Sequence, residues 1–117
     1  MKKYNIEQNT IQIEAFAEPL TQEDVKIIEE KATILMNTFD KINFMITLGV
    51  HEKVSLKAQL ETLRFAFKTW KRIHKIAVIG NSNKEHVLVT MNNAFVPWKE
   101  KYFDIDDLAK AYSWLKD

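Results

Sequence analysis

The chain has 117 residues, no cysteine, and 17 basic against 16 acidic side chains, which gives a formal net charge of +1. This length predicts one domain, residues 1–117, with a core that needs no disulfides. The lack of cysteine excludes a thiol nucleophile and cysteine-ligated metal sites, and the near-neutral charge argues against a nucleic-acid binder. No apolar run approaches the roughly 18 residues of a membrane span and the start is unlike a signal peptide, so we expect a cytoplasmic protein.

The first third of the chain predicts two short strands followed by a helix. Residues Tyr4–Gln8 and Thr10–Phe16 alternate apolar and polar side chains, as half-buried strands do, and Asn9 between them indicates a tight hairpin. Thr21 is a typical N-cap. Acidic residues in the first turn and apolar residues at helical spacing then predict a helix over Gln22–Thr38.

The middle of the chain predicts alternating buried strands and helices. Ile42–Val50 is nearly all apolar, which is typical of a strand covered on both faces. An apolar stripe then predicts a helix over Ser55–Arg72, with Ser55 as its cap. Ile76–Ile79 is another buried run that ends at a Gly-Asn turn, and Ser82–Asn93 has a weaker helical pattern.

The last part of the chain predicts a strand at Glu100–Phe103 and a final helix capped by Asp104. The full order is then ββαβαβαβα, with about four helices. Alternating buried strands and helices imply an α/β fold with a mostly parallel sheet and right-handed crossovers. The leading hairpin adds an antiparallel edge to that sheet.

This element order, together with two segments, resembles the SpoIIAA-like group of STAS domains (sulfate transporter and anti-sigma factor antagonist). Trp70–Asn81 resembles that group's basic-then-apolar strand entering a short polar turn. Tyr102–Asp104 followed by Ala111–Leu115 resembles the group's ending, an aromatic strand and a helix that closes on Trp-Leu. The resemblance implies a STAS fold and a non-enzymatic binding or regulatory role without a cofactor. It also implies an association with membranes or apolar ligands, and hence a location at the inner face of the membrane.

The resemblance further implies a phosphorylation candidate, Ser55. In classical anti-sigma antagonists a phosphorylatable serine begins the helix after the central strand, within an Asp-Ser-Ser-type motif. The matching segment here is His51–Ser55, in which no Asp precedes Ser55 and no second hydroxyl follows it. Ser55 therefore has two interpretations, a phosphorylation site and a plain helix N-cap.

Two short polar motifs follow predicted strands, where open α/β sheets place their ligands. His51 and Glu52 are a candidate acid–base pair, with a solvated loop as the alternative. Asn81 and Ser82 are a candidate anion site at a helix N-terminus, with a simple turn as the alternative. The spacing of the three histidines matches no metal-ligand motif, so we expect no metal.

Basic residues are concentrated in one stretch of the chain. Lys53 to Lys75 contains seven basic residues and one acid, a net charge of +6, whereas the rest of the chain carries ten basic and fifteen acidic residues, a net charge of −5. Helical spacing places Phe65 nearly opposite the apolar stripe, beside basic neighbours. An exposed aromatic residue among basic residues suits a binding surface, and the alternative is a solvated helix face. Trp98 is a second candidate exposed aromatic residue, and its alternative is packing over the sheet edge. The candidate ligand-binding or surface-binding residues are Arg64, Phe65, Lys68, Lys71, Arg72 and Trp98.

Three classes of function remain open from the sequence. The first is a STAS-like binding or regulatory domain whose basic helix meets an anionic membrane, an apolar or anionic small ligand, or a protein. The second is a homodimeric interaction module that buries Phe65 or Trp98. The third is a small enzyme with a site at the strand C-terminal ends, built from His51, Glu52, Ser55 or Ser82.

Overall fold

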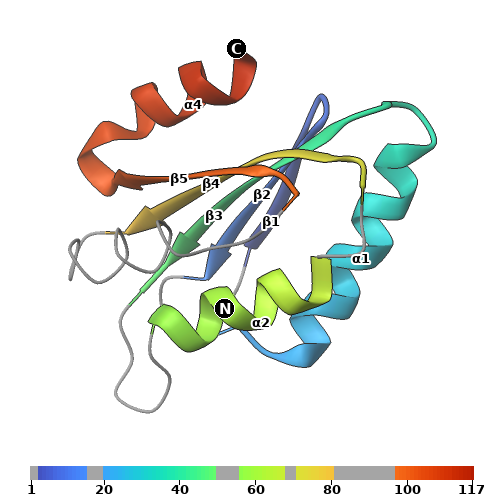
Figure 1. Cartoon of the computed structure of the whole chain (residues 1–117), viewed down its shortest axis with the longest axis horizontal. Helices are drawn as coiled ribbons and strands as arrows, with labels where there is room; N and C mark the ends of the chain where they lie inside the picture. The colour runs from blue at the N-terminus through green and yellow to red at the C-terminus, as the bar shows by residue number, and fades with distance from the viewer. Residues whose placement is uncertain (1–2, 16–19, 50–55, 68–70, 81–96) are drawn as a thin grey trace.

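The computed structural model describes residues 3–15, 20–49, 56–67, 71–80 and 97–117, which form one mixed sheet with helices on both faces (Figure 1). The strands are β1 (Lys3–Glu7), β2 (Thr10–Ala15), β3 (Ile42–Leu48), β4 (Ile73–Gly80) and β5 (Lys99–Asp104). The helices are α1 (Gln22–Met36), α2 (Leu56–Phe67) and α4 (Leu108–Lys116), with the short 3-10 helix η1 (Ile105–Asp107) directly before α4.

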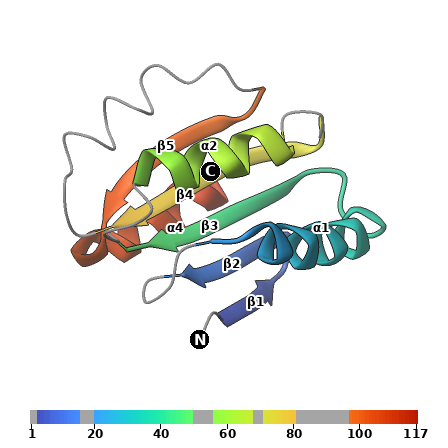
Figure 2. The same ribbon diagram turned by 90° about the horizontal axis from the view of Figure 1, so that it is seen from below.

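The five strands lie in the sheet in chain order, β1-β2-β3-β4-β5. β1 pairs antiparallel with β2, and the later neighbours pair in parallel. Right-handed crossovers that all advance in one direction place their helices on one face of the sheet. Accordingly α1 and α2 share a face and α4 covers the opposite one (Figures 1 and 2). The predicted α/β fold, with its N-terminal hairpin and mostly parallel sheet, is confirmed.

The predicted boundaries that differ most from the structure are those of the second helix and of the strand after it. The second helix ends at Phe67 rather than at Arg72, because Lys71 and Arg72 form a turn that leads into β4. β4 begins at Ile73, earlier than the predicted Ile76. The helix predicted over Ser82–Asn93 lies outside the described residues. None of the described helices is long and apolar enough to cross a membrane.

The hairpin turn consists of Gln8 and Asn9, in agreement with the turn predicted at Asn9. Gln8 has a φ of 53°, in the left-handed region that such tight turns require. Asn9 also ties the turn to β3, since its Nδ2 donates to the carbonyl of Lys41 at 3.0 Å and its carbonyl accepts from the Asn43 backbone N–H at 2.8 Å. The turn thereby fixes the register between the hairpin and the parallel strands.

The start of α1 follows the predicted cap. Thr21 accepts a hydrogen bond from the Asp24 backbone N–H through Oγ1, and the Asp24 carboxylate accepts from the Thr21 backbone N–H at 2.8 Å. This reciprocal arrangement satisfies two donors that a helix N-terminus leaves without intrahelical partners. Asp24 also accepts a hydrogen bond from the Tyr4 hydroxyl at 2.8 Å, which ties β1 to α1.

The larger core lies between the sheet and the pair α1 and α2. Ile28 of α1 and Phe67 of α2 are fully buried there, and the Phe67 ring stacks on Phe44 of β3 with centroids 4.9 Å apart. Fully burying a side chain of this size contributes roughly 1.5–3 kcal/mol. The strand residues that face this core include Ile11, Ile13, Phe44, Ile46, Ile76 and Val78.

A bulge between β3 and β4 decides which side chains face α4. Ile42 pairs with Ile73, but Asn43 pairs with Lys75, so His74 is the extra residue on β4. In a regular strand residues 73 and 75 would point to the same face. The extra residue instead turns Lys75 toward α4, while Ile73 stays in the larger core.

Lys75 and Asn43 hold the C-terminal end of α4 against the sheet. The Lys75 ammonium donates to the carbonyl of Trp114 at 2.6 Å and lies 5.2 Å from the centre of the Trp114 ring. Asn43 Nδ2 donates to the carbonyl of Leu115 at 3.2 Å, and Asn43 Oδ1 accepts from the Lys75 backbone N–H at 3.1 Å. A positive charge at a helix C-terminus is favourable, and these carbonyls have no partner within the helix.

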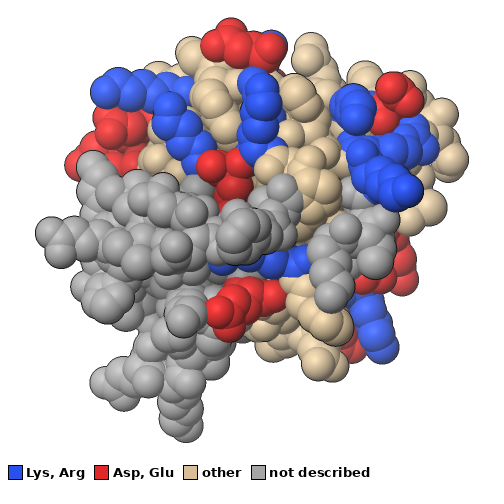
Figure 3. Space-filling model, viewed as in Figure 1, with Lys and Arg blue, Asp and Glu red and all other residues tan. Residues whose placement is uncertain are grey.

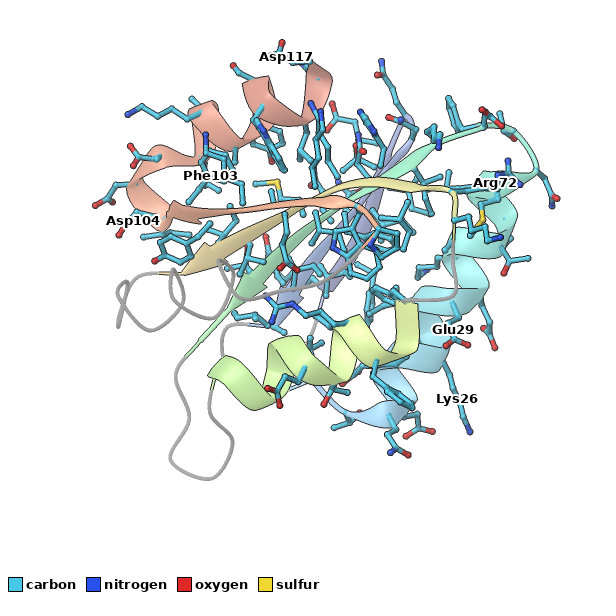
Figure 4. The ribbon with its side chains drawn as sticks, in the orientation of Figure 1. Lys26, Glu29, Arg72, Phe103, Asp104 and Asp117 are labelled. Atoms are coloured by element: carbon cyan, nitrogen blue, oxygen red, sulfur yellow. The ribbon has the colours of Figure 1, made fainter. Side chains whose placement is uncertain are left out.

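Beneath α4 lies a smaller core. It contains Met45, Ala77, Ile79, Phe103, Ala111 and Leu115, and Figure 4 shows Phe103 on the sheet face below the helix. The Phe103 and Trp114 rings pack with centroids 5.7 Å apart. This core is small, so the polar contacts made by Lys75 contribute a large share of what holds α4 in place.

We predict that Lys75→Met destabilises the protein by about 1–3 kcal/mol, because methionine keeps the packing stem but leaves the partly buried Trp114 carbonyl without its donor. Urea unfolding followed by tryptophan fluorescence measures the change. Lys26→Met is the matched control, because Lys26 is exposed on α1 and points away from the sheet (Figure 4). Equal stability of the two variants would contradict a structural role for the Lys75 ammonium.

Candidate functional site

Several predicted site residues lie outside the described part of the chain. They are His51, Glu52, Ser55, Lys68, Asn81 and Ser82. The acid–base, phosphorylation and anion-binding hypotheses for these residues therefore stay predictions.

Arg64 was predicted to present a cation on the surface, and this prediction is wrong. Its guanidinium forms a two-point ion pair with Glu100 of β5, with Nη2 2.6 Å and Nε 3.1 Å from Oε2. Only 13% of the Arg64 side chain and 5% of the Glu100 side chain are exposed. Removing one partner of such a buried pair typically costs about 3–5 kcal/mol, because the other charge is left unpaired. Arg64 therefore joins α2 to β5 and offers little charge to a ligand.

Arg72 also has an internal partner. Its guanidinium donates to the carbonyls of Met36 and Phe39 at 2.6 Å each and to that of Asp40 at 3.0 Å. Figure 4 shows Arg72 beside the chain that leaves α1. The Met36 carbonyl lies at the negative end of α1, where a cation is favoured, and Phe39 and Asp40 belong to the segment that follows the helix. The prediction of Arg72 as a ligand-binding residue is corrected to a C-terminal cap of α1.

Trp98 had two interpretations, an exposed aromatic residue and packing over the sheet edge, and the structure contradicts the exposed one. Only 6% of Trp98 is exposed, and it packs in the larger core with Tyr102. Its position directly before the parallel strand β5 brings the ring under the helical layer instead of out to solvent. Within the described residues its Nε1 has no hydrogen-bond partner. Trp114 is half-buried and packs against the smaller core.

Among the described residues of the predicted basic and aromatic surface, Phe65 and Lys71 are exposed. Phe65 is 72% exposed, as helical spacing predicted, and Lys71 is exposed in the turn before β4. On the face drawn in Figure 3, the described Lys and Arg side chains are interspersed with Asp and Glu. On that face, the described basic residues do not form a continuous patch.

A groove that the sequence did not reveal runs between α4 and the sheet. α4 packs mainly over β4 and β5, and among the described residues a depression lies beside it over the same face of β2 and part of β3. We call this depression the α4 groove; it has a polar and an apolar section, and Gln12 and Tyr112 line both. The polar section, about 390 Å³, is lined by Glu7, Gln8, Asn9, Thr10, Gln12, Asn43, His74, Tyr112, Leu115, Lys116 and Asp117. The apolar section, about 360 Å³, is lined by Gln12, Ile13, Glu14, Met45, Thr47, Ile105, Leu108 and Tyr112.

The apolar section suits the hydrocarbon part of a small molecule. Leu108 and Ile105 form its wall, and Met45 forms part of its floor. Methionine is unbranched and polarisable, so it adapts to ligands of different shape. Gln12 and Tyr112 stand where the two sections meet, and their amide and hydroxyl groups can hydrogen-bond to a polar headgroup.

His74 is the histidine of the polar section. Burial, followed by the positive charges of Lys75, Lys99 and Lys41, lowers the pKa of His74 below its ordinary value of 6.5. The imidazole is therefore neutral at pH 7 and can both donate and accept a hydrogen bond. His74 is the bulge residue near the start of β4, which lies between β3 and β5 in the sheet.

There is a physical reason why the groove could not be predicted from the sequence. Gln12 and Glu14 are the polar positions of an alternating strand, and such positions usually face open water. Ile105, Leu108, Tyr112 and Leu115 form the predicted apolar stripe of the last helix, which by itself implies packing against the sheet. Only the placement of α4 toward β5 leaves half of that stripe bordering a groove.

Comparison with known proteins gives one match. Residues 10–116 match the model of the family described as SpoIIAA-like. None of the curated proteins and none of the solved structures matches the chain significantly. The match covers nearly the whole chain and confirms the resemblance found in the sequence.

We predict that His74 makes the protein less stable as the pH falls below neutrality. Because the pKa of His74 is lowered in the folded state, the unfolded chain binds more protons between pH 6.5 and that lowered value, and protonation favours unfolding. His74→Gln removes this contribution. Thermal unfolding at about pH 7.5 and about pH 5.5 should show a larger loss of melting temperature for the wild type than for the variant. Equal losses would contradict the lowered pKa.

Proposed function

The chain belongs to the SpoIIAA-like family of STAS-like domains, and from this premise we propose that it is a non-enzymatic binding domain for an apolar small molecule with a polar headgroup. The α4 groove carries this proposal. Its apolar section of about 360 Å³ adjoins a polar section of about 390 Å³. These volumes fall in the range of small-molecule sites, which are mostly apolar with a few polar groups that orient the ligand.

The chemistry of the groove suits ligand binding. Its neutral imidazole, hydroxyls and amides, with the carboxylates of Glu7, Glu14 and Asp117, can form hydrogen bonds to a polar headgroup, whereas the ammonium of the neighbouring Lys75 is already held by the Trp114 carbonyl. A regulatory role follows if ligand binding changes how α4 packs, because α4 forms one wall of the groove. We place such a domain in the cytoplasm, where it meets its ligand free or at the inner face of the membrane.

A second candidate function rests on Phe65. We propose that the exposed Phe65 inserts into an anionic membrane surface while Lys71 contacts lipid phosphates. The exposure of both residues supports this, since exposed aromatic and basic residues are typical of interfacial anchors. The internal pairing of Arg64 and Arg72 leaves fewer cations for this surface, so we expect weak and salt-sensitive binding.

We predict that Thr47→Trp abolishes binding of a fluorescent fatty acid, cis-parinaric acid. Thr47 lies on the floor of the apolar section, so an indole there fills the space that the hydrocarbon chain would occupy. Titration of the purified protein should give saturable fluorescence for the wild type. The affinity of the variant should be at least roughly tenfold lower, because the hydrocarbon chain can no longer be buried in the apolar section.

The matched control for this titration is Thr33→Trp, which adds the same side chain to the exposed face of α1. Native mass spectrometry of the protein as expressed checks for a retained apolar molecule. Equal binding by both tryptophan variants, or no saturable binding by the wild type, would argue against the α4 groove as the site.

We predict that Phe65→Ser reduces binding to vesicles of phosphatidylglycerol and phosphatidylcholine by about tenfold at low salt, because the variant has no aromatic side chain to bury in the bilayer interface. Phe65→Trp should restore binding. Co-sedimentation with the vesicles measures both variants. Wild-type protein that stays in the supernatant at low ionic strength would rule out the membrane-surface function.

A further inference from the structure

β1 has an outer edge whose backbone groups point away from the sheet. β1 is the terminal strand, with β2 as its neighbour, and Figure 2 shows it at the margin of the sheet. In a hairpin with a two-residue turn, the closing pair exchanges both backbone hydrogen bonds, and bonded and non-bonded pairs then alternate. Glu7 and Thr10 are that closing pair. The N–H and C=O groups of Tyr4 and Ile6 therefore point outward.

We propose that β1 pairs antiparallel with β1 of a second copy of this chain, about a two-fold axis at Asn5. Tyr4 of one copy then lies opposite Ile6 of the other, and their outward backbone groups form the interchain hydrogen bonds. A two-fold axis at Tyr4 would place Ile6 opposite residue 2, and one at Ile6 would place Tyr4 opposite Gln8 of the turn. Only the axis at Asn5 uses both outward residues within the strand.

The charges of β1 are self-complementary in this register. Lys3, Asn5 and Glu7 share one face of the strand, because they pair with Glu14, Gln12 and Thr10 of β2. With the axis at Asn5, Lys3 of each copy lies directly opposite Glu7 of the other. Opposite charges placed across from each other stabilise strand pairs, and like charges destabilise them. Charged edge strands discourage pairing with unrelated strands, but this register places Lys3 and Glu7 of the two copies opposite each other.

Exposed apolar residues lie on the side of the molecule that the second copy would meet. Ile6 of β1 is 42% exposed and Ile34 of α1 is 65% exposed. The Tyr4 hydroxyl bonds Asp24 and the Lys31 ammonium lies 5.8 Å from the Tyr4 ring, so this flank of α1 faces β1. Ile34 follows Lys31 by three residues and lies about 60° further round the helix, away from the buried face of α1. A continuous sheet places the second copy's α1 on this same face, across the two-fold axis.

The test measures oligomeric state by light scattering after size exclusion over a range of protein concentrations. We expect the mass to rise from the 13.8 kDa monomer toward twice that value as the concentration increases. Glu7→Lys places Lys3 opposite a lysine twice in the dimer, so its dissociation constant should rise roughly tenfold. The charge-exchanged double variant Lys3→Glu/Glu7→Lys should recover most of the wild-type affinity.

A backbone variant tests the pairing independently of charge. Ile6→Pro removes an outward N–H that β2 does not use, so it should abolish the dimer while the monomer stays folded by circular dichroism. Phe65→Ser separates this interface from one on α2 and should leave the dimer unchanged. A monomer at every concentration, a dimer lost in Phe65→Ser but kept in Ile6→Pro, or a double variant no tighter than Glu7→Lys would each overturn the proposal.

Discussion

The bulge at His74 and the side chains of Lys75 and Asn43 hold α4 in its position on one face of the sheet. One extra residue in β4 turns Lys75 toward α4, where its ammonium meets the carbonyl end of that helix, and Asn43 from β3 completes the attachment. A buried ammonium is costly unless it is hydrogen-bonded, and here a helix C-terminus supplies both the acceptor and a favourable field. The position of α4 over β4 and β5 follows from this contact. So does the open space over β2 and β3 that forms the α4 groove.

On the other face of the sheet, charged side chains also hold separate elements together. The stretch from Lys53 to Lys75 carries a net +6, yet its described arginines serve the fold. Arg64 joins α2 to β5 through Glu100, and Arg72 binds the carbonyls that end α1. Each guanidinium stabilises a junction between elements far apart in the chain, which the planar multi-donor geometry of arginine suits. The local excess of positive charge is therefore a poor guide to the working surface.

Much of the fold was predictable because its patterns are local. Alternation predicted the hairpin, apolar runs predicted the buried strands, and the predicted cap Thr21 is confirmed. Asp104, predicted to cap the last helix, instead caps the 3-10 helix η1 that precedes α4. The site was not predictable to the same degree. The partners of Arg64 and Arg72 lie more than thirty residues away in the sequence, and Trp98 is buried by elements that no local pattern relates to it. The groove is lined by polar positions of β2 that a strand pattern assigns to solvent.

The sequence by itself determined the element order, the family and the α/β class, because periodicity, capping and buried runs depend on neighbours within a few residues. It also determined that Phe65 stands opposite the apolar stripe of its helix, a consequence of helical geometry alone. Only the tertiary structure decided which cations are internal, which aromatic residues are buried, and where a ligand finds room. Those outcomes depend on the bulge at His74 and on contacts between distant segments. Such contacts form only when the strands are aligned in the sheet and the helices have been placed on its two faces.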